Sequence, residues 1–269
     1  MEDYLIGKKL YGDDFSLEEI RTWFNEEAEG YANLLGDEEK KNFTYEYHEL
    51  NKIYGFNKIK KDKIFTHALG FGSAFGNEFE PVISRIQSIT IIEPSDQLFS
   101  HTIGNIKPVY VKPDISGKLP FESNSFDLIT CFGTLHHIPN VSTVLSEMIR
   151  VLKPDGYMLI REPINSMGDW REKRDGLTKN ERGIPVRIFD EIFKKYDLEI
   201  VGKSYCYTMM SFLQRKFGKY FKQAVFSYAL VMKMDKYLSK LLKFNYTYHH
   251  EKFHQRIAPS NIFYVVRKK

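Results

Sequence analysis

The sequence predicts an α/β fold with a doubly wound, mostly parallel sheet. Three observations support this prediction: short apolar runs alternate with helical patterns from residue 64 to residue 207, a glycine-rich turn follows the first run, and an acidic residue ends the second. At 269 residues, the chain is long enough for one large domain or for a domain that carries an insertion.

The first two strands predict a nucleoside-containing cofactor. Residues 64–69 form an apolar run that leads into the turn 70–76, whose glycines let the backbone pass close to a ligand. The next run, 89–92, ends at Glu93, where a carboxylate can accept hydrogen bonds from a ribose diol. The turn departs from the dinucleotide fingerprint, because Phe75 stands where the third glycine is expected. A nicotinamide cofactor is therefore the minor alternative.

The remaining elements continue the alternation. We expect helices at 76–86, 95–103, 141–152 and 185–196, and strands at 107–112, 126–132, 157–160, 198–207 and 262–266. The helix at 141–152 has apolar residues at helical spacing and stops before Pro154 and Gly156, which end helices and favour turns.

The two ends of the chain differ in charge and pattern. Residues 1–60 look mainly helical, with a capping box at Ser16 and Glu19, and we expect them to form a lid. Residues 209–258 predict a helical insertion before the last strand, and 209–269 hold 13 Lys/Arg against 2 Asp/Glu. Within it, one helical face carries Met234, Tyr237, Leu238, Leu241 and Leu242, and the other carries Lys233, Lys236, Lys240 and Lys243. We expect this insertion to be a cap packed on the domain with its lysines in water. Contact of its basic amphipathic helix with a membrane surface is the alternative.

The composition predicts a cytoplasmic protein. No apolar run is long enough to span a bilayer, and the N-terminus lacks the layout of a secretory signal. The two cysteines, Cys131 and Cys206, form no C-x-x-C pair, so neither a disulfide framework nor a metal site is expected.

The motifs, taken as a series, resemble those of class I S-adenosylmethionine-dependent methyltransferases, in particular the methyltransferase type 11 group. The resemblance covers residues 64–164. The matching segments are Leu69-Gly70-Phe71-Gly72, Ile92-Glu93-Pro94-Ser95, Asp114 with Leu119-Pro120-Phe121, Phe126-Asp127-Leu128-Ile129, Leu135-His136-His137-Ile138-Pro139 and Leu152-Lys153-Pro154-Asp155-Gly156-Tyr157.

This resemblance implies a seven-stranded sheet with an antiparallel last strand, and S-adenosylmethionine as the cofactor, with S-adenosylhomocysteine as its product. It implies a cofactor-binding domain made of 61–208 and 259–269. The cofactor-binding residues carried over are Gly70, Phe71, Gly72, Gly76, Glu93, Pro94, Asp114, Ile115, Cys131 and Phe132. The family commonly has an acidic residue shortly before the first glycine, where this chain has His67 and Ala68. Backbone carbonyls near Gly70 and Cys131 would then contact the amino group of the cofactor.

Catalytic candidates follow the fourth and fifth strands, at the carboxyl edge of the sheet where ligands bind in such folds. His137 is the first candidate for a general base that accepts a proton from an acceptor hydroxyl, followed by His136 and by Glu162 at the end of the fifth strand. The alternative is that the histidines only orient their loop, because much of the rate of methyl transfer can come from positioning.

The expected acceptor is small and anionic. Arg171, Arg174 and Arg182 could bind a phosphate or carboxylate, while Tyr11, Asp13 and His48 could form a lid. The N-terminal segment is similar to methyltransferases encoded with bacterial surface-polysaccharide genes, which implies methylation of an oxygen of a saccharide or of a nucleotide-linked or phosphorylated intermediate.

Two other functions stay open: a methyltransferase for a lipid or quinone-like acceptor at the membrane surface, and a non-catalytic partner protein with the same fold. Nucleic acid is not an expected partner, because Cys131-Phe132-Gly133-Thr134 stands in place of the motif that base-directed amino methyltransferases carry.

Overall fold

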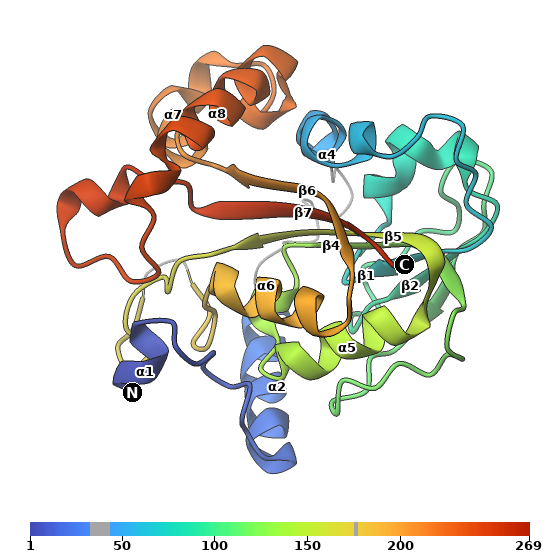
Figure 1. Ribbon diagram of the computed structural model, residues 1–269, viewed down its shortest axis with the longest axis horizontal. Helices are drawn as coiled ribbons and strands as arrows, with labels where there is room; N and C mark the ends of the chain where they lie inside the picture. The colour runs from blue at the N-terminus through green and yellow to red at the C-terminus, as the bar shows by residue number, and fades with distance from the viewer. Residues whose placement is uncertain (33–43, 175–176) are drawn as a thin grey trace.

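A central sheet organises the molecule. The computed structural model describes residues 1–32, 44–174 and 177–269. Within these residues the sheet has seven strands in the order β3-β2-β1-β4-β5-β7-β6, and β7 runs antiparallel to both of its neighbours (Figure 1). The strands are β1 Ala68–Phe71, β2 Ile89–Ile92, β3 Val109–Val111, β4 Phe126–Phe132, β5 Leu152–Pro163, β6 Glu199–Cys206 and β7 Asn261–Arg267. The predicted fold class, with its antiparallel last strand, is confirmed.

Helices cover both faces of the sheet. The α-helices are α1 Glu2–Leu5, α2 Leu17–Ala32, α4 His48–Tyr54, α5 Val141–Val151, α6 Val186–Lys195, α7 Met210–Phe217 and α8 Ala229–Leu242. The 3₁₀ helices are η1 Phe56–Lys58, η2 Asn77–Arg85, η3 Leu135–His137, η4 Gly218–Tyr220, η5 Val225–Ser227, η6 Lys243–Asn245 and η7 Phe253–Arg256. In Figure 1, α5 and α6 lie on one face, with α4, α7 and α8 on the other.

The strands build two hydrophobic cores, because successive side chains of a strand point to opposite faces. In β1, Leu69 and Phe71 belong to the core beneath α5 and α6, whereas Ala68 belongs to the core beneath α4 and η2. The amphipathic spacing of α5 explains the first core, since it buries Val144, Leu145, Met148 and Ile149.

Two expected helices differ from the structure. Residues 95–103 form bends and irregular backbone rather than a helix, since the Ser95 hydroxyl accepts a hydrogen bond from the Gln97 amide and competes with helical bonding. The segment after the glycine turn is the 3₁₀ helix η2, which contains Pro81, a residue without a backbone donor.

Helix α8 packs on the domain through a different face from the expected one. Its buried residues are Met232, Asp235 and Ser239, whereas Met234, Tyr237 and Leu241 of the predicted apolar face are exposed. The hydrogen bonds of Asp235 determine which face of α8 is buried. Its carboxylate accepts hydrogen bonds from the backbone amides of residues 207–209, directly before α7, and from the hydroxyl of Tyr54 in α4. None of the helices in the described part of the chain is long and apolar enough to cross a membrane.

Candidate active site

A cleft opens at the carboxyl ends of β1, β2 and β4, with an empty volume of about 710 Å³. Its walls come from these strand ends and from helix α2. The lining residues are Phe24, Glu27, Phe71, Gly72, Ile92, Glu93, Pro94, Pro113, Thr134, His137 and Ile138. A smaller hollow shares four of these residues and adds Asp114 and Gly117. We call the two together the main cleft.

The turn after β1 forms the floor of the main cleft and requires glycine at position 72. Gly72 has a φ of +65°, and a Cβ atom there would lie 2.2 Å from Cγ2 of Thr134. Its amide donates to the carbonyl of Ile92 at the end of β2. A side chain at this position would be strained and would clash with the loop after β4. The backbone can therefore approach a bound ligand closely at Gly72.

Glu93 lies at the tip of β2, as predicted, and is held there by the backbone. Its carboxylate accepts hydrogen bonds from the amides of Ala74 at 3.1 Å and Ser95 at 3.0 Å. Burial raises the pKa of Glu93, and these two hydrogen bonds oppose that rise. A carboxylate has about four acceptor positions. Glu93 can therefore keep both amide partners and also accept hydrogen bonds from a ligand in the main cleft.

The predicted cofactor-binding residues divide into two groups. Phe71, Gly72, Glu93, Pro94 and Asp114 line the main cleft, and the other five, Gly70, Gly76, Ile115, Cys131 and Phe132, do not belong to its lining.

Gly76 has a packing role. It has a φ of +73°, and a Cβ atom there would lie 2.2 Å from Cδ1 of Ile103. Cys131 is buried, with its Sγ atom 3.9 Å from Oε1 of Glu162.

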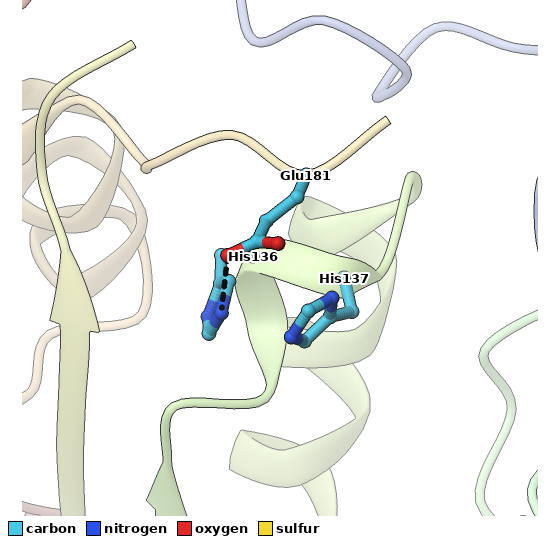
Figure 2. Close-up of side chains that lie close together, drawn as sticks. All are labelled: His136, His137 and Glu181. Carbon is cyan, nitrogen blue, oxygen red and sulfur yellow. Dashed lines mark ion pairs between the residues drawn. The ribbon is translucent and has the colours of Figure 1, made fainter. Parts of the chain in front are cut away.

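The two adjacent histidines face different carboxylates. His136 and His137 lie beside Glu181, which comes from the loop before α6 (Figure 2). Nδ1 of His137, which lines the main cleft, is 3.0 Å from Oε2 of Glu27. Nδ1 of His136 is 2.8 Å from Oε2 of Glu162, and its Nε2 is 3.6 Å from Oε1 of Glu181. Burial lowers the pKa of His136, so this imidazole is neutral near pH 7 and donates from Nδ1 to Glu162.

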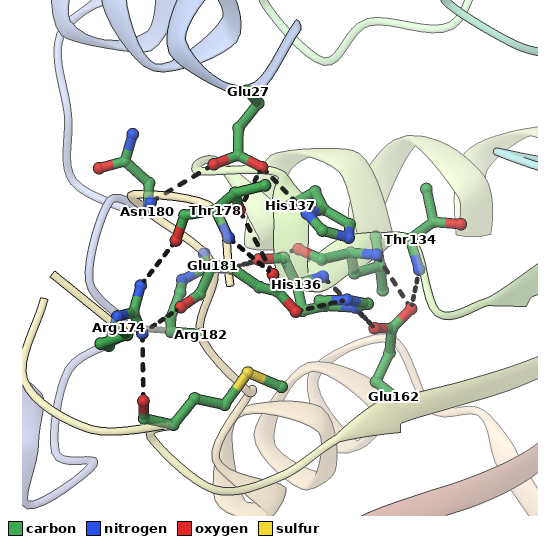
Figure 3. Close-up of polar contacts among 12 residues, drawn as sticks. Glu27, Thr134, His136, His137, Glu162, Arg174, Thr178, Asn180, Glu181 and Arg182 are labelled. Atoms are coloured by element: carbon green, nitrogen blue, oxygen red, sulfur yellow. Dashed lines mark hydrogen bonds and ion pairs between the residues drawn. The ribbon is translucent and has the colours of Figure 1, made fainter. Parts of the chain in front are cut away.

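Glu162 holds the loop that carries the histidines. It is fully buried and accepts hydrogen bonds from the amides of Thr134 and Leu135 as well as from His136 (Figure 3). Although burial raises the pKa of Glu162, the contacts with His136 and the backbone amides outweigh it and lower the pKa overall. Glu162 is not among the residues that line the main cleft, and its contacts hold the loop of His136 and His137 in place.

The predicted anion-binding arginines are occupied within the protein. Arg182 is fully buried, and its guanidinium donates to five backbone carbonyls, those of Tyr11, Leu135, His136, Ile138 and Pro139. Arg174 donates to four, those of Met167, Thr178, Lys179 and Glu181. Arg171 is exposed and pairs with Asp169. A guanidinium has five N–H donors, so Arg182 retains none for a substrate.

The predicted lid residues lie in three places. The backbone carbonyl of Tyr11 accepts a hydrogen bond from Arg182, and its ring stacks on Trp170 with centroids 5.0 Å apart. Asp13 accepts from the amide and hydroxyl of Ser142 at the start of α5. His48 lies in a different hollow, beside Glu80. Asp13 and His48 do not line the main cleft, and neither does Tyr11.

Sequence reasoning missed several residues of the main cleft, chiefly Phe24 and Glu27 in α2. Helix α2 was expected, but a helical pattern alone does not say which strand ends the helix covers. The indole of Trp23 donates to the carbonyl of His137 at 2.8 Å, and this contact fixes α2 over the cleft. The Ile20, Trp23 and Glu27 spacing was the available signal, since it places three side chains on one helix face.

Comparisons with known proteins agree with this geometry. Residues 69–160 match the family model of the methyltransferase domain. The ubiquinone/menaquinone biosynthesis C-methyltransferase UbiE of Idiomarina loihiensis is 37% identical over 93 residues, which are 34% of this chain and 36% of the relative. A phthiotriol/phenolphthiotriol dimycocerosates methyltransferase of Mycobacterium ulcerans is 41% identical over 54 residues, 19% of this chain and 20% of the relative. The matched segments thus span about a third or less of these relatives.

Solved structures show the same fold at low identity. A Haloferax volcanii chain described as a methyltransferase, in complex with the activator Trm112, aligns over 86% of this chain and 94% of its own, with a TM-score of 0.55 and 11% identity. The YcgJ protein of Bacillus subtilis aligns over 82% and 99%, with a TM-score of 0.50 and 17% identity. Residues 69–160 therefore match the model of a methyltransferase domain, and the solved structures show a class I methyltransferase fold around this segment.

Proposed function

We propose that this chain, which carries a methyltransferase domain at residues 69–160, transfers a methyl group from S-adenosylmethionine to a small-molecule acceptor. The observation that carries the proposal is that Gly72, Glu93 and Asp114, three of the predicted cofactor contacts, line one cleft. In this cleft Glu93 would accept hydrogen bonds from the ribose hydroxyls. The exposed Asp114 carboxylate would face the adenine amino group.

The chemistry needs an acceptor atom placed in line with the sulfonium–methyl bond, and the walls of the main cleft would supply that positioning. The electron pair of the acceptor forms the new bond to the methyl carbon, and the sulfur keeps the electrons of the bond that breaks. His137 is the group that would accept a proton from the acceptor. With Nδ1–H donated to Glu27, its lone pair is on Nε2, and Glu27 would stabilise the imidazolium that forms.

The class of acceptor is the second part of the proposal. The contacts predicted for a sugar or phosphorylated acceptor were Arg171, Arg174 and Arg182. Arg174 and Arg182 instead donate hydrogen bonds to backbone carbonyls, and Arg171 pairs with Asp169. A lipophilic, quinone-like acceptor that the enzyme meets at an anionic membrane surface fits the structure better. The names of the relatives from Idiomarina loihiensis and other bacteria, which concern ubiquinone and menaquinone biosynthesis, support the same acceptor class.

A basic apolar surface on α8 supports the membrane encounter. An exposed stripe recurs at helical spacing along α8 and continues into η6; its members are Leu230, Met234, Tyr237, Leu241 and Phe244, each at least 53% exposed. Lys233, Lys240 and Lys243 are exposed beside it. We call these eight residues the α8 stripe. An apolar stripe flanked by lysines is typical of helices that lie in the plane of an anionic bilayer surface.

The experiment for this function is a transfer assay with methyl-labelled S-adenosylmethionine. Parallel reactions contain a bacterial membrane lipid extract or a mixture of nucleotide sugars. We expect label in the organic phase of the lipid reaction. Label that stays in the aqueous phase and is found in the nucleotide sugars would overturn the lipophilic acceptor and restore the saccharide one. No transfer in either reaction, by a protein that does not bind S-adenosylmethionine, would contradict methyl transfer itself.

A further inference from the structure

Three potential metal ligands converge beside the main cleft. His136 and His137 are adjacent in η3, and Glu181 comes from the loop before α6 (Figure 2). One ligand atom from each of the three side chains lies within 4.8 Å of the other two. Nε2 of His136 is 3.6 Å from Oε1 of Glu181. Two ligands of a tetrahedral ion with bonds of about 2.1 Å are separated by about 3.4 Å, close to the observed distance.

Both histidines are oriented as ligating histidines usually are. A histidine that binds a metal through one ring nitrogen generally donates its other N–H to a carboxylate, which fixes the ring and its tautomer. Here Glu162 accepts a hydrogen bond from Nδ1 of His136, and Glu27 accepts one from Nδ1 of His137 (Figure 3). For both rings Nε2 is then the nitrogen with the lone pair. A pair of merely structural histidines does not require two separate carboxylates.

Glu181 is held with one oxygen toward the histidines. Its Oε2 accepts hydrogen bonds from the amide and the hydroxyl of Thr178, and Oε1 faces His136. The Thr178 hydroxyl lies at 2.8 Å from Oε2 of Glu27, which joins the two carboxylates through one residue. The loop is itself held by Arg174, which donates to the backbone carbonyls of Thr178 and Glu181. Hydrogen bonds therefore hold both the two histidines and the loop that carries Glu181.

The local charge favours a cation. Glu27, Glu162 and Glu181 place three carboxylates around the two histidines, and the nearby guanidinium groups of Arg174 and Arg182 bind backbone carbonyls instead of these carboxylates. A set of two imidazoles and one carboxylate is a ligand set that Zn²⁺ and other first-row divalent ions accept.

We propose that His136, His137 and Glu181 form a binding site for one divalent transition-metal ion at the edge of the main cleft. Three protein ligands leave a coordination position open, and His137 lines the cleft. Binding of the ion does not depend on the proposed function, but its role does. An ion there would hold an acceptor oxygen and lower the pKa of its hydroxyl, so that His137 would serve as a ligand rather than as a base.

The test is cobalt binding to the full chain after treatment with a chelator. Co²⁺ is titrated while its visible d–d absorption is recorded, and equilibrium dialysis gives the stoichiometry. Glu181→Gln keeps an acceptor for Thr178 but weakens the ligand, and His137→Gln removes one imidazole. His101→Gln, at an exposed histidine far from the cluster in sequence, is the matched control. Thermal melting identifies any variant that fails to fold.

We expect one Co²⁺ per chain with an absorption of four- or five-coordinate geometry, affinity at least tenfold weaker in Glu181→Gln, and no change in His101→Gln. Uptake below a tenth of an ion per folded native chain would overturn the site. Equal uptake by native protein and a folded Glu181→Gln variant would overturn it as well. Cofactor binding is measured separately, by calorimetric titration of the metal-free protein with S-adenosylmethionine. Loss of Co²⁺ binding alone then contradicts the metal site, and loss of cofactor binding alone contradicts the proposed function.

Discussion

Oε2 of Glu27 lies 3.0 Å from Nδ1 of His137 and joins helix α2 to the loop after β4, across 110 positions of sequence. The same carboxylate accepts a hydrogen bond from the hydroxyl of Thr178 at 2.8 Å. Three separate segments of the chain thus meet at one buried acidic side chain on the wall of the main cleft. Helix α2 is for this reason part of the site.

Replacing Glu27 tests this junction. Glu27→Ala removes the carboxylate beside Nδ1 of His137 and the nearer of the two acceptors of the Thr178 hydroxyl, so we expect the free energy of unfolding to fall by about 1–3 kcal/mol. Urea denaturation measures the change. Glu18→Ala, an exposed position on the same helix, is the control and should change stability little. Equal stability of the two variants would show that the junction contributes nothing.

Much of the fold, but less of the site, could be predicted from the sequence. The residues at strand ends can be identified from the local sequence. Gly72, which has a positive φ, directly follows β1, and the acidic Glu93 directly follows β2; both line the main cleft. The roles of Arg182 and Asp235 depend on groups from distant segments, since both satisfy backbone groups that no local pattern identifies. For this reason Arg182 was predicted as a substrate contact, although its guanidinium is paired within the protein, and the face through which α8 packs was predicted wrongly.

Arg182 should matter for folding rather than for substrate affinity. Lysine has three donors and cannot replace the five hydrogen bonds to backbone carbonyls, so Arg182→Lys leaves buried acceptors unpaired. We expect a loss of about 3 kcal/mol or more in the free energy of unfolding. Urea denaturation compares it with Arg171→Lys, at an exposed arginine. A folded Arg182→Lys variant of native stability, with only a raised KM for the acceptor, would return Arg182 to the binding site.

Glu78 should make stability depend on pH. Burial raises its pKa to about 7 from an ordinary value of 4.5, while Ser73, Thr130 and the nearby Arg161 act in the opposite direction. The native state therefore holds this proton where the unfolded chain has released it, and the contribution of Glu78 to stability is full below pH 4.5 and is lost as the pH rises through 7.

Glu78→Gln cannot titrate, so the variant should gain stability relative to the native chain as the pH rises from about 4.5 to 7.5, by about 3 kcal/mol. Urea denaturation at a series of pH values measures this difference. Glu122→Gln, at an exposed position, is the control and should run parallel to the native chain. A constant difference between Glu78→Gln and the native protein over this range would mean that Glu78 has an ordinary pKa.

The α8 stripe should bind anionic vesicles. Met234→Ser combined with Leu241→Ser removes two exposed apolar side chains and leaves the anchoring Asp235 in place. We expect the native chain to co-sediment with vesicles that contain phosphatidylglycerol, less so at high salt, and the double variant to bind at least tenfold more weakly. Ile64→Ser, an exposed apolar position in another part of the fold, is the control. Native protein that stays in the supernatant would exclude the membrane encounter.

The most direct test of the central claim is calorimetric titration of the native chain, and of Glu93→Gln, with S-adenosylmethionine. The amides of Ala74 and Ser95 donate to different oxygens of Glu93, so glutamine keeps an acceptor for only one of them and loses the charge. We predict binding of one cofactor per native chain and about tenfold to hundredfold weaker binding to the variant, as expected for hydrogen bonds to a charged group. A folded native chain that binds no cofactor, or a variant that binds it equally well, would contradict the assignment of the main cleft.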